Sequence, residues 1–271
     1  MNRSRWTLTT LLPHVHDWLH LETASGLWQV LRRLGLSYKR ARDYLHSPDP
    51  DYEAKQAAIQ QYLQRAHAEP HRYVFLYMDE FTFYRQPSLA SAYADQGSKL
   101  PLAQRSYHSD TKGRVVAALN AGTGQVTYLL RARTDLPVMR QFYAHLRATY
   151  PDAEQIFAAQ DNWPVHAHPD VVAVLEEQEY PFWPTLPANW PTAPRPNWET
   201  DDLPIQLLFQ PTYAPWTNPI EKLWRWLQQE HLHLHRLSDD WPALKQCVSD
   251  FLDRFAGPSP ELLHYVGLLP D

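Results

Sequence analysis

The sequence predicts an α/β fold in which a mixed sheet is flanked by helices and preceded by a small all-α helix-turn-helix domain. Two observations support this prediction. From about residue 71 onwards, short apolar runs alternate with segments of helical periodicity. Before them, two short helical patterns flank a glycine within residues 1–50. We therefore divide the chain into a partial helix-turn-helix domain at 1–50, a connecting helix at 51–70 and an α/β domain at 71–271.

Composition limits the classes of protein to which the chain can belong. Of its 271 residues, 44% are hydrophobic, which is enough for a substantial core. The chain has no apolar segment long enough to cross a bilayer, and its first ten residues lack the apolar core of a signal peptide. With Cys247 as its single cysteine, it fits a reducing compartment, so we expect a cytoplasmic protein. A net charge of −5 means that any binding to nucleic acid must depend on local basic patches.

One such patch lies in the predicted helix-turn-helix. Ser25 can cap a first helix that ends at Gly35, and Ser37 can cap a second helix that ends before the SPDPD sequence. We predict that the basic residues of these helices contact DNA phosphates: Arg32, Arg33, Lys39, Arg40 and Arg42. The alternative is a helical hairpin whose charges are simply solvated.

The remaining elements follow from periodicity and from turn residues. Residues 51–68 are rich in alanine and glutamine and have little apolar face, which indicates a helix that connects two domains. Further along, we expect a strand at 73–78, a hairpin at 113–133, a helix at 135–149, a strand at 156–160, a helix at 169–179, a strand at 205–209, and helices at 217–230 and 239–255.

Three of these elements carry an acidic residue at a comparable place. Asp79 and Asp161 directly follow apolar runs, and Glu221 lies in the first turn of a helix that Asn218 can cap, with Pro219 at its first position. If the three apolar runs are neighbouring strands, the three carboxylates converge at one edge of the sheet. They would then repel one another unless divalent cations lay between them. The alternative for Glu221 is a purely local role at the helix N-terminus.

Other residues near these acids have two possible roles. Asn162 and His166 follow Asp161 and would either order water and substrate or make hydrogen bonds within a loop. A proline-rich insertion at 181–204 separates the second and third acids and excludes a helix or an inner strand. Its tryptophans would either stack on bases or pack back on the domain: Trp183, Trp190 and Trp198. Three alternating histidines do not match common zinc spacings: His231, His233 and His235.

Three sequence segments resemble the signature regions of a known family. They are MDEFTFYRQP at 78–87, QDNWPVH at 160–166 and PTYAPWTNPIEKLWRWL at 211–227. They are similar to the motifs of the DDE-superfamily transposases of bacterial insertion sequences, in the branch related to mariner elements. Matched residue by residue, the catalytic, metal-binding acids of that family fall on Asp79, Asp161 and Glu221. Gln210 and Thr212 depart from the pattern, because leucine and proline are usual at these positions.

The resemblance carries expectations about fold and activity. It implies an RNase H-like catalytic domain after a winged helix-turn-helix, and two bound Mg²⁺ or Mn²⁺ ions. It also implies cleavage of double-stranded DNA at element ends, strand transfer into a target, a homodimer in the DNA complex and a location at the nucleoid. One alternative is a transposase-derived DNA-binding protein without catalytic activity. Another is a nuclease-fold relative that acts on RNA or branched DNA.

Overall fold

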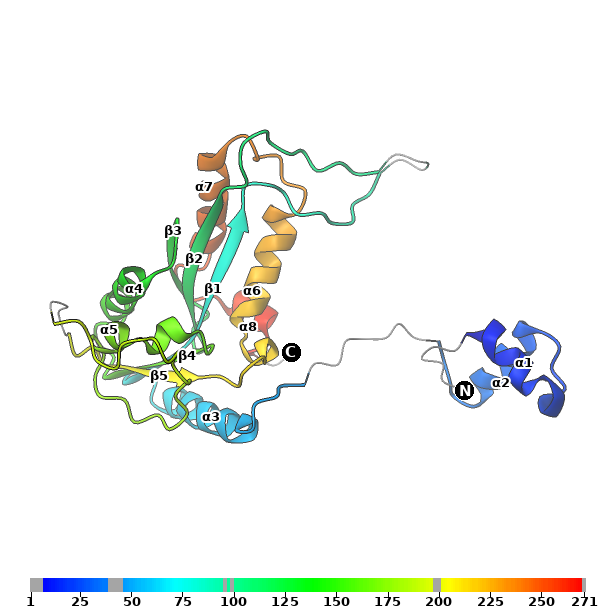
Figure 1. The fold of residues 1–271 in the computed structure, drawn as a ribbon, viewed down its shortest axis with the longest axis horizontal. Helices are drawn as coiled ribbons and strands as arrows, with labels where there is room; N and C mark the ends of the chain where they lie inside the picture. The colour runs from blue at the N-terminus through cyan, green and yellow to red at the C-terminus, as the bar shows by residue number, and fades with distance from the viewer. Residues whose placement is uncertain (1–6, 39–45, 95–96, 98–99, 197–200, 270–271) are drawn as a thin grey trace. The chain divides into compact units, whose positions relative to one another are not determined.

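A computed structural model describes residues 7–38, 46–94, 97, 100–196 and 201–269. The chain forms two compact units, Met1–Leu45 and His46–Asp271 (Figure 1). Each unit is described by itself below. No helix among the described residues is both long enough and apolar enough to span a membrane.

The first unit contains two helices, α1 (Leu8–Leu19) and α2 (Ala24–Arg33). Thr7 caps α1 through a capping box. Thr23, and not Ser25 as expected, caps α2, because its side chain accepts a hydrogen bond from the Gly26 N–H. Gly35 follows α2 with a φ of 73°, the left-handed conformation predicted from the sequence. Most of the predicted second helix falls on residues 39–45, so Lys39, Arg40 and Arg42 lie outside the described residues.

The second unit is built on a five-stranded mixed sheet with the order β3-β2-β1-β4-β5. The strands are β1 (Tyr73–Tyr84), β2 (Lys112–Asn120), β3 (Val126–Arg131), β4 (Gln155–Gln160) and β5 (Ile205–Phe209). β1, β2 and β3 pair antiparallel, whereas β4 pairs parallel with both β1 and β5. The predicted mixed sheet is confirmed, and the three apolar runs that precede the acidic residues are neighbouring strands.

Helices flank this sheet (Figure 1). They are α3 (Tyr52–Ala68), α4 (Leu136–Thr149), α5 (Pro169–Val172), α6 (Ile220–Leu227), α7 (Trp241–Asp253) and α8 (Pro260–Val266). The helix that the sequence suggested as a connector is α3, which packs on β1 and β4 and buries Ile59, Leu63 and Ala66. It is therefore a layer of the second unit. The helix expected at 169–179 ends at Val172, and Leu175 instead forms a β-bridge with Leu203.

The described part of the proline-rich insertion packs back on the second unit. The Trp183 ring lies 5.1 Å from the ring of Phe209, and the Trp190 ring lies 5.0 Å from that of His168. The Arg195 guanidinium pairs at 2.7 Å with Asp170, whose side chain is fully buried. These contacts favour the packing role for the two tryptophans; Trp198 lies outside the described residues.

Candidate active site

Strand register brings Asp79 and Asp161 together. We expected the first strand to end at Met78, but β1 continues to Tyr84 because β2 pairs with it along this whole stretch. In contrast, β4 stops at Gln160. Tyr77 pairs with Ala159, so continuing the parallel register by two residues places Asp161 beside Asp79.

The same register brings β5 and α6 to this edge of the sheet. Phe209 pairs with Gln160, and the Gln210 N–H donates to the Gln160 carbonyl at 2.9 Å, so Gln210 follows beside Asp161. Asn218 does not cap α6 as expected: its side-chain amide donates to the Met78 carbonyl on β1 at 2.9 Å, and Pro219 immediately precedes the helix. This bond ties the start of α6 to the strand that carries Asp79, and it positions Glu221 in the first turn of the helix.

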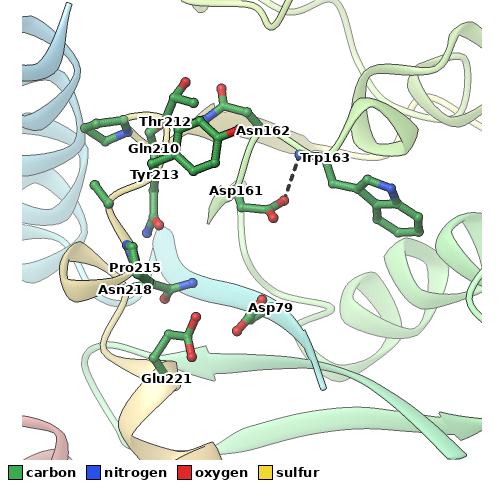
Figure 2. Close-up of a pocket in the computed structure, with 12 residues that line it drawn as sticks. Asp79, Asp161, Asn162, Trp163, Gln210, Thr212, Tyr213, Pro215, Asn218 and Glu221 are labelled. Atoms are coloured by element: carbon green, nitrogen blue, oxygen red, sulfur yellow. Dashed lines mark hydrogen bonds between the residues drawn. The ribbon is translucent and has the colours of Figure 1, made fainter. Parts of the chain in front are cut away.

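The three predicted acids, Asp79, Asp161 and Glu221, line one cavity of about 400 Å³ (Figure 2). The cavity is also lined by Asn162, Trp163, Asn218 and the segment 210–215. Asp79 from within β1, Asp161 from just after β4 and Glu221 from the first turn of α6 therefore converge, as the sequence pattern predicted for neighbouring strands.

Asp79 is the most electrostatically strained of the three acids. Its carboxylate accepts the Glu80 N–H at 2.9 Å and the indole N–H of Trp224 at 2.8 Å. Burial, followed by repulsion from Glu221 and Glu80, nevertheless raises the pKa of Asp79 well above its ordinary value. Burial and the charge of Asp161 likewise raise the pKa of Glu221, although Arg225 opposes them. Negative charge in the cavity is therefore incompletely balanced by the protein.

Asp161 has a different environment, because a buried histidine provides a counter-charge. The Nε2 atom of His166 lies 3.4 Å from Asp161 Oδ1 and 3.4 Å from Glu80 Oε1. Burial disfavours the imidazolium, but these carboxylates outweigh it and raise the pKa of His166 to about 10. Burial alone would raise the pKa of Asp161, but His166 and the Trp163 N–H, at 2.9 Å, lower it. Paired with Asp161 and Glu80 in this way, His166 acts as a counter-ion, and the three side chains also offer ligand atoms within 4.8 Å of one another, a spacing that could hold a metal ion.

Asn162 and the segment 211–215 shape the wall of the cavity. The Asn162 amide donates to the Gln210 carbonyl at 2.5 Å and so links the ends of β4 and β5. The Thr212 carbonyl accepts the Ser47 hydroxyl at 2.6 Å, and the Thr212 N–H donates to Asp49 at 2.8 Å. Lys55 pairs with the same Asp49 oxygen at 2.8 Å. The wall is thus held by residues at the very start of the second unit.

Several contributors to this site were not predicted, among them Glu80, Trp224, Ser47 and Asp49. Trp224 lies one helical turn after Glu221, so helical spacing could have placed it on the same face. Ser47 and Asp49 belong to the SPDPD sequence, which we interpreted only as a helix breaker. No sequence signal connects that segment to Thr212, 165 residues away from Ser47.

The basic residues predicted to contact DNA lie in the first unit. Arg32 and Arg33 occupy the last turn of α2, and both are exposed. The Arg32 guanidinium lies over the Trp28 ring at 5.4 Å. These two arginines therefore present positive charge to solvent.

Known proteins resemble the chain in sequence and in fold. The sequence profile described as DDE superfamily endonuclease matches residues 74–245. The chain is 24% identical over 252 residues to a protein of Shigella sonnei named "Insertion element IS630 uncharacterized 39 kDa protein". That alignment covers 93% of this chain, which spans only 65% of the length of the relative.

Two solved structures support the fold. The Mos1 mariner paired end complex with Mn has a TM-score of 0.60 at 18% identity, covering 100% of this chain and 77% of that one. The corresponding complex with Mg has a TM-score of 0.55 at 16% identity, covering 98% and 77%. These likenesses confirm the predicted RNase H-like fold.

The sequence profile matches well over half of the length of this chain. The chain therefore belongs to the DDE superfamily endonucleases.

Proposed function

We propose that the protein is a transposase that cleaves DNA at the ends of a mobile element and joins those ends to a target. The observation that carries this proposal is the convergence of three carboxylates, Asp79, Asp161 and Glu221, on one cavity of a DDE-family fold. The name of the Shigella sonnei relative, an insertion-element protein, supports it, as do the paired end complexes formed by Mos1.

The donor set fits a divalent cation. Carboxylate oxygens are hard ligands of the kind that Mg²⁺ and Mn²⁺ prefer, and the raised pKa values of Asp79 and Glu221 reflect charge that a cation would neutralise. Two such ions, when bound, would stabilise the attacking and leaving oxygens of a displacement at phosphorus. Support also comes from the Mos1 paired end complexes with Mn and with Mg.

The chain's own residues would hold these ligands in place. Trp224 fixes one oxygen of Asp79, and the Trp163 N–H fixes one oxygen of Asp161. The positive charge of His166 keeps Asp161 ionised and therefore able to bind a cation. Because Asp79 lies within a paired strand and Glu221 at the start of a helix anchored to that strand, the ligands would be preorganised.

We further propose the division of the chain and the contacts with DNA. The first unit, within the domain predicted at 1–50, would bind the element ends. The connector predicted at 51–70 contains α3 and would be a structural layer of the catalytic domain predicted at 71–271. The phosphate contacts would come from the basic residues already named: Arg32, Arg33, Lys39, Arg40 and Arg42. Two protomers would hold the two ends as a homodimer, and the protein would be associated with the nucleoid.

Metal-dependent nicking of a supercoiled plasmid tests the catalytic proposal. The wild-type protein should convert supercoiled plasmid to open circles with Mg²⁺ or Mn²⁺, and EDTA should stop the reaction. Asp161→Ala should be inactive, whereas Asp152→Ala, which removes an exposed acid shortly before β4, should be fully active. A protein that binds duplex DNA but never nicks it under these conditions would support the non-catalytic alternative.

DNA flanking the coding sequence tests the transposition proposal. Labelled duplexes from both flanks should be bound in preference to a scrambled duplex, and the cleaved ends should become joined to a target plasmid. Chromatography of the end complex with light-scattering detection should give the mass of two protomers. Equal binding of flanking and scrambled duplexes would contradict end recognition.

A further inference from the structure

Two buried side-chain amides line the cavity alongside the acids. Gln210 is 4% exposed and Asn218 is 5% exposed. The amide nitrogen of Asn218 donates to the Met78 carbonyl, which can only accept, so the Asn218 amide has a fixed orientation. Its Oδ1 atom has no hydrogen-bond partner among the described residues, and neither does Nε2 of Gln210. In Figure 2 the Gln210 side chain points from its loop toward Asn218 and Glu221.

Such unpartnered groups are unusual in a folded protein. A buried donor without an acceptor forfeits the free energy of the hydrogen bonds it made with water, and most buried polar groups therefore have partners. Among the other buried glutamines of this unit, Gln206 on β5 donates to Gln178 at 3.1 Å and to the Leu207 carbonyl at 3.2 Å. Gln160 Nε2 on β4 also lacks a partner among the described residues, but Gln160 does not line the cavity. The Nε2 atom of Gln210 is therefore suited to donate a hydrogen bond to a bound ligand.

The charges around Gln210 determine which end of its amide faces the cavity. Gln210 directly follows β5 beside Asp161, and it shares the cavity with Asp79 and Glu221. These three carboxylates attract the positive N–H end of the amide dipole and repel its carbonyl end. The cavity consequently presents an N–H donor in a place dominated by acceptors.

The chemistry of the donor identifies the ligand group. A phosphodiester is an anion whose non-bridging oxygens only accept hydrogen bonds, and carboxylates repel it. Asn218 Oδ1 is itself an acceptor and cannot bind such an oxygen, whereas the Gln210 amide can. We propose that the Gln210 side-chain amide donates a hydrogen bond to a non-bridging oxygen of the DNA phosphodiester that is cleaved, and so positions it against the three acids. This inference rests on the proposed function.

The substitution Gln210→Met tests it, with Gln206→Met as a matched control. Methionine keeps the length of the side chain and removes the amide. Because Gln210 Nε2 has no partner among the residues that the structure describes, its replacement should leave the thermal midpoint unchanged or raise it. The rate of plasmid nicking at saturating DNA should nevertheless fall by about tenfold to a hundredfold, with KM for the plasmid and the Mg²⁺ dependence unchanged. Gln206→Met should do the reverse, lowering the midpoint without slowing nicking.

The outcomes separate this inference from the proposed function. A wild-type protein that does not nick plasmid DNA contradicts the proposed function itself. If the wild type nicks and Gln210→Met nicks equally fast, the inference is overturned. It is also overturned if Gln210→Met loses nicking only in proportion to a lowered thermal midpoint, because the role would then be structural.

A second measurement identifies the phosphate oxygen without relying on the fold of the variant. Nicking positions are first mapped on a duplex, which is then synthesised with one phosphorothioate diastereomer at a mapped position. For one diastereomer, sulfur should slow the wild type more than it slows Gln210→Met, because sulfur is the weaker acceptor and the variant has lost the donor. Equal slowing of the two proteins with both diastereomers would rule out the contact.

Discussion

Asp49 and Asp79 are acidic residues of the same compact unit, and their surroundings shift their pKa values in opposite directions. The Asp49 side chain is 3% exposed, yet Lys55 and the backbone N–H groups of Thr212 and Asp51 overcome its burial and lower its pKa to about 2. Asp79 accepts two N–H groups, but its burial and the carboxylates that it faces raise its pKa. An acid compensated by the protein is a structural element, and an acid left uncompensated requires a cation from outside.

The largest expected effect of this difference is on catalysis. Asp79→Ala should abolish Mg²⁺-dependent nicking without unfolding the protein, and Asp161→Ala and Glu221→Ala should do the same. Asp49→Asn should retain nicking at temperatures at which it remains folded, because Asp49 holds the cavity wall only through Thr212. Plasmid nicking and circular dichroism melting curves measure the two properties. Residual nicking in Asp79→Ala would remove Asp79 from the catalytic set.

A smaller loss of activity is expected when a support of Asp79 is removed. Trp224→Phe keeps an aromatic ring stacked on Phe81, at a present centroid distance of 5.1 Å, but removes the N–H that holds Asp79. Partners that orient metal ligands typically contribute about tenfold to a hundredfold to activity or metal affinity, and we expect a loss in this range. Nicking rates as a function of Mg²⁺ concentration provide the measurement.

Trp226→Phe is the matched control for this variant. Trp226 lies on the same helix but packs against Phe251, Phe255 and Tyr265. The control should melt at a lower temperature while nicking normally. If Trp224→Phe and Trp226→Phe lose activity in the same proportion, the loss of the hydrogen bond to Asp79 does not explain the lower activity.

Asp49, the acid compensated by the protein, should make the folded protein less stable at acidic pH. Because the pKa of Asp49 is lower in the folded protein than in the unfolded chain, its contribution to stability is present above about pH 4 and is lost as the pH falls toward 2. The shift corresponds to about 2 kcal/mol. In denaturant titrations, the difference in unfolding free energy between wild type and Asp49→Asn should shrink by about this amount from pH 5 to pH 2. A difference that stays constant with pH would contradict the assigned pairing.

Asp79, the acid left uncompensated, should instead make the folded protein less stable at neutral pH. A carboxyl group whose folded pKa is raised destabilises the fold at neutral pH, because there the unfolded chain ionises this group more readily than the folded protein does. In EDTA at pH 7, Asp79→Asn should therefore raise the thermal midpoint, by on the order of a few degrees, since asparagine can still accept the Trp224 N–H. A lowered midpoint would show that the repulsion is already relieved within the protein.

The positions of the acids were predictable because an apolar run and the acid that follows it are local features of the sequence. Asp79 and Asp161 follow apolar runs, and once those runs are parallel neighbours the acids must lie side by side. The length of β1 was not predictable, because its extension to Tyr84 depends on pairing with β2. The role of Asn218 was also missed, since capping competes with a hydrogen bond to Met78, 140 residues away in the sequence.

The supports of the site depend on contacts between distant parts of the chain. Asp49 and Thr212 are brought together only by the folded unit, and so are Glu80 and His166. The described part of the proline-rich insertion contains no helix and no inner strand, as its prolines predict. Its packing through Trp183 and Arg195 could not be derived, because nothing in its composition specifies Phe209 and Asp170 as partners.

Calorimetric titration with Mg²⁺ and Mn²⁺ tests the central claim most directly, namely that Asp79, Asp161 and Glu221 together form a cation site. Wild type and Asp49→Asn should bind the ions with the same affinity, and Asp79→Asn and Asp161→Asn should bind them far more weakly while remaining folded. Equal affinity in all four proteins, or no binding by the wild type, would contradict the account.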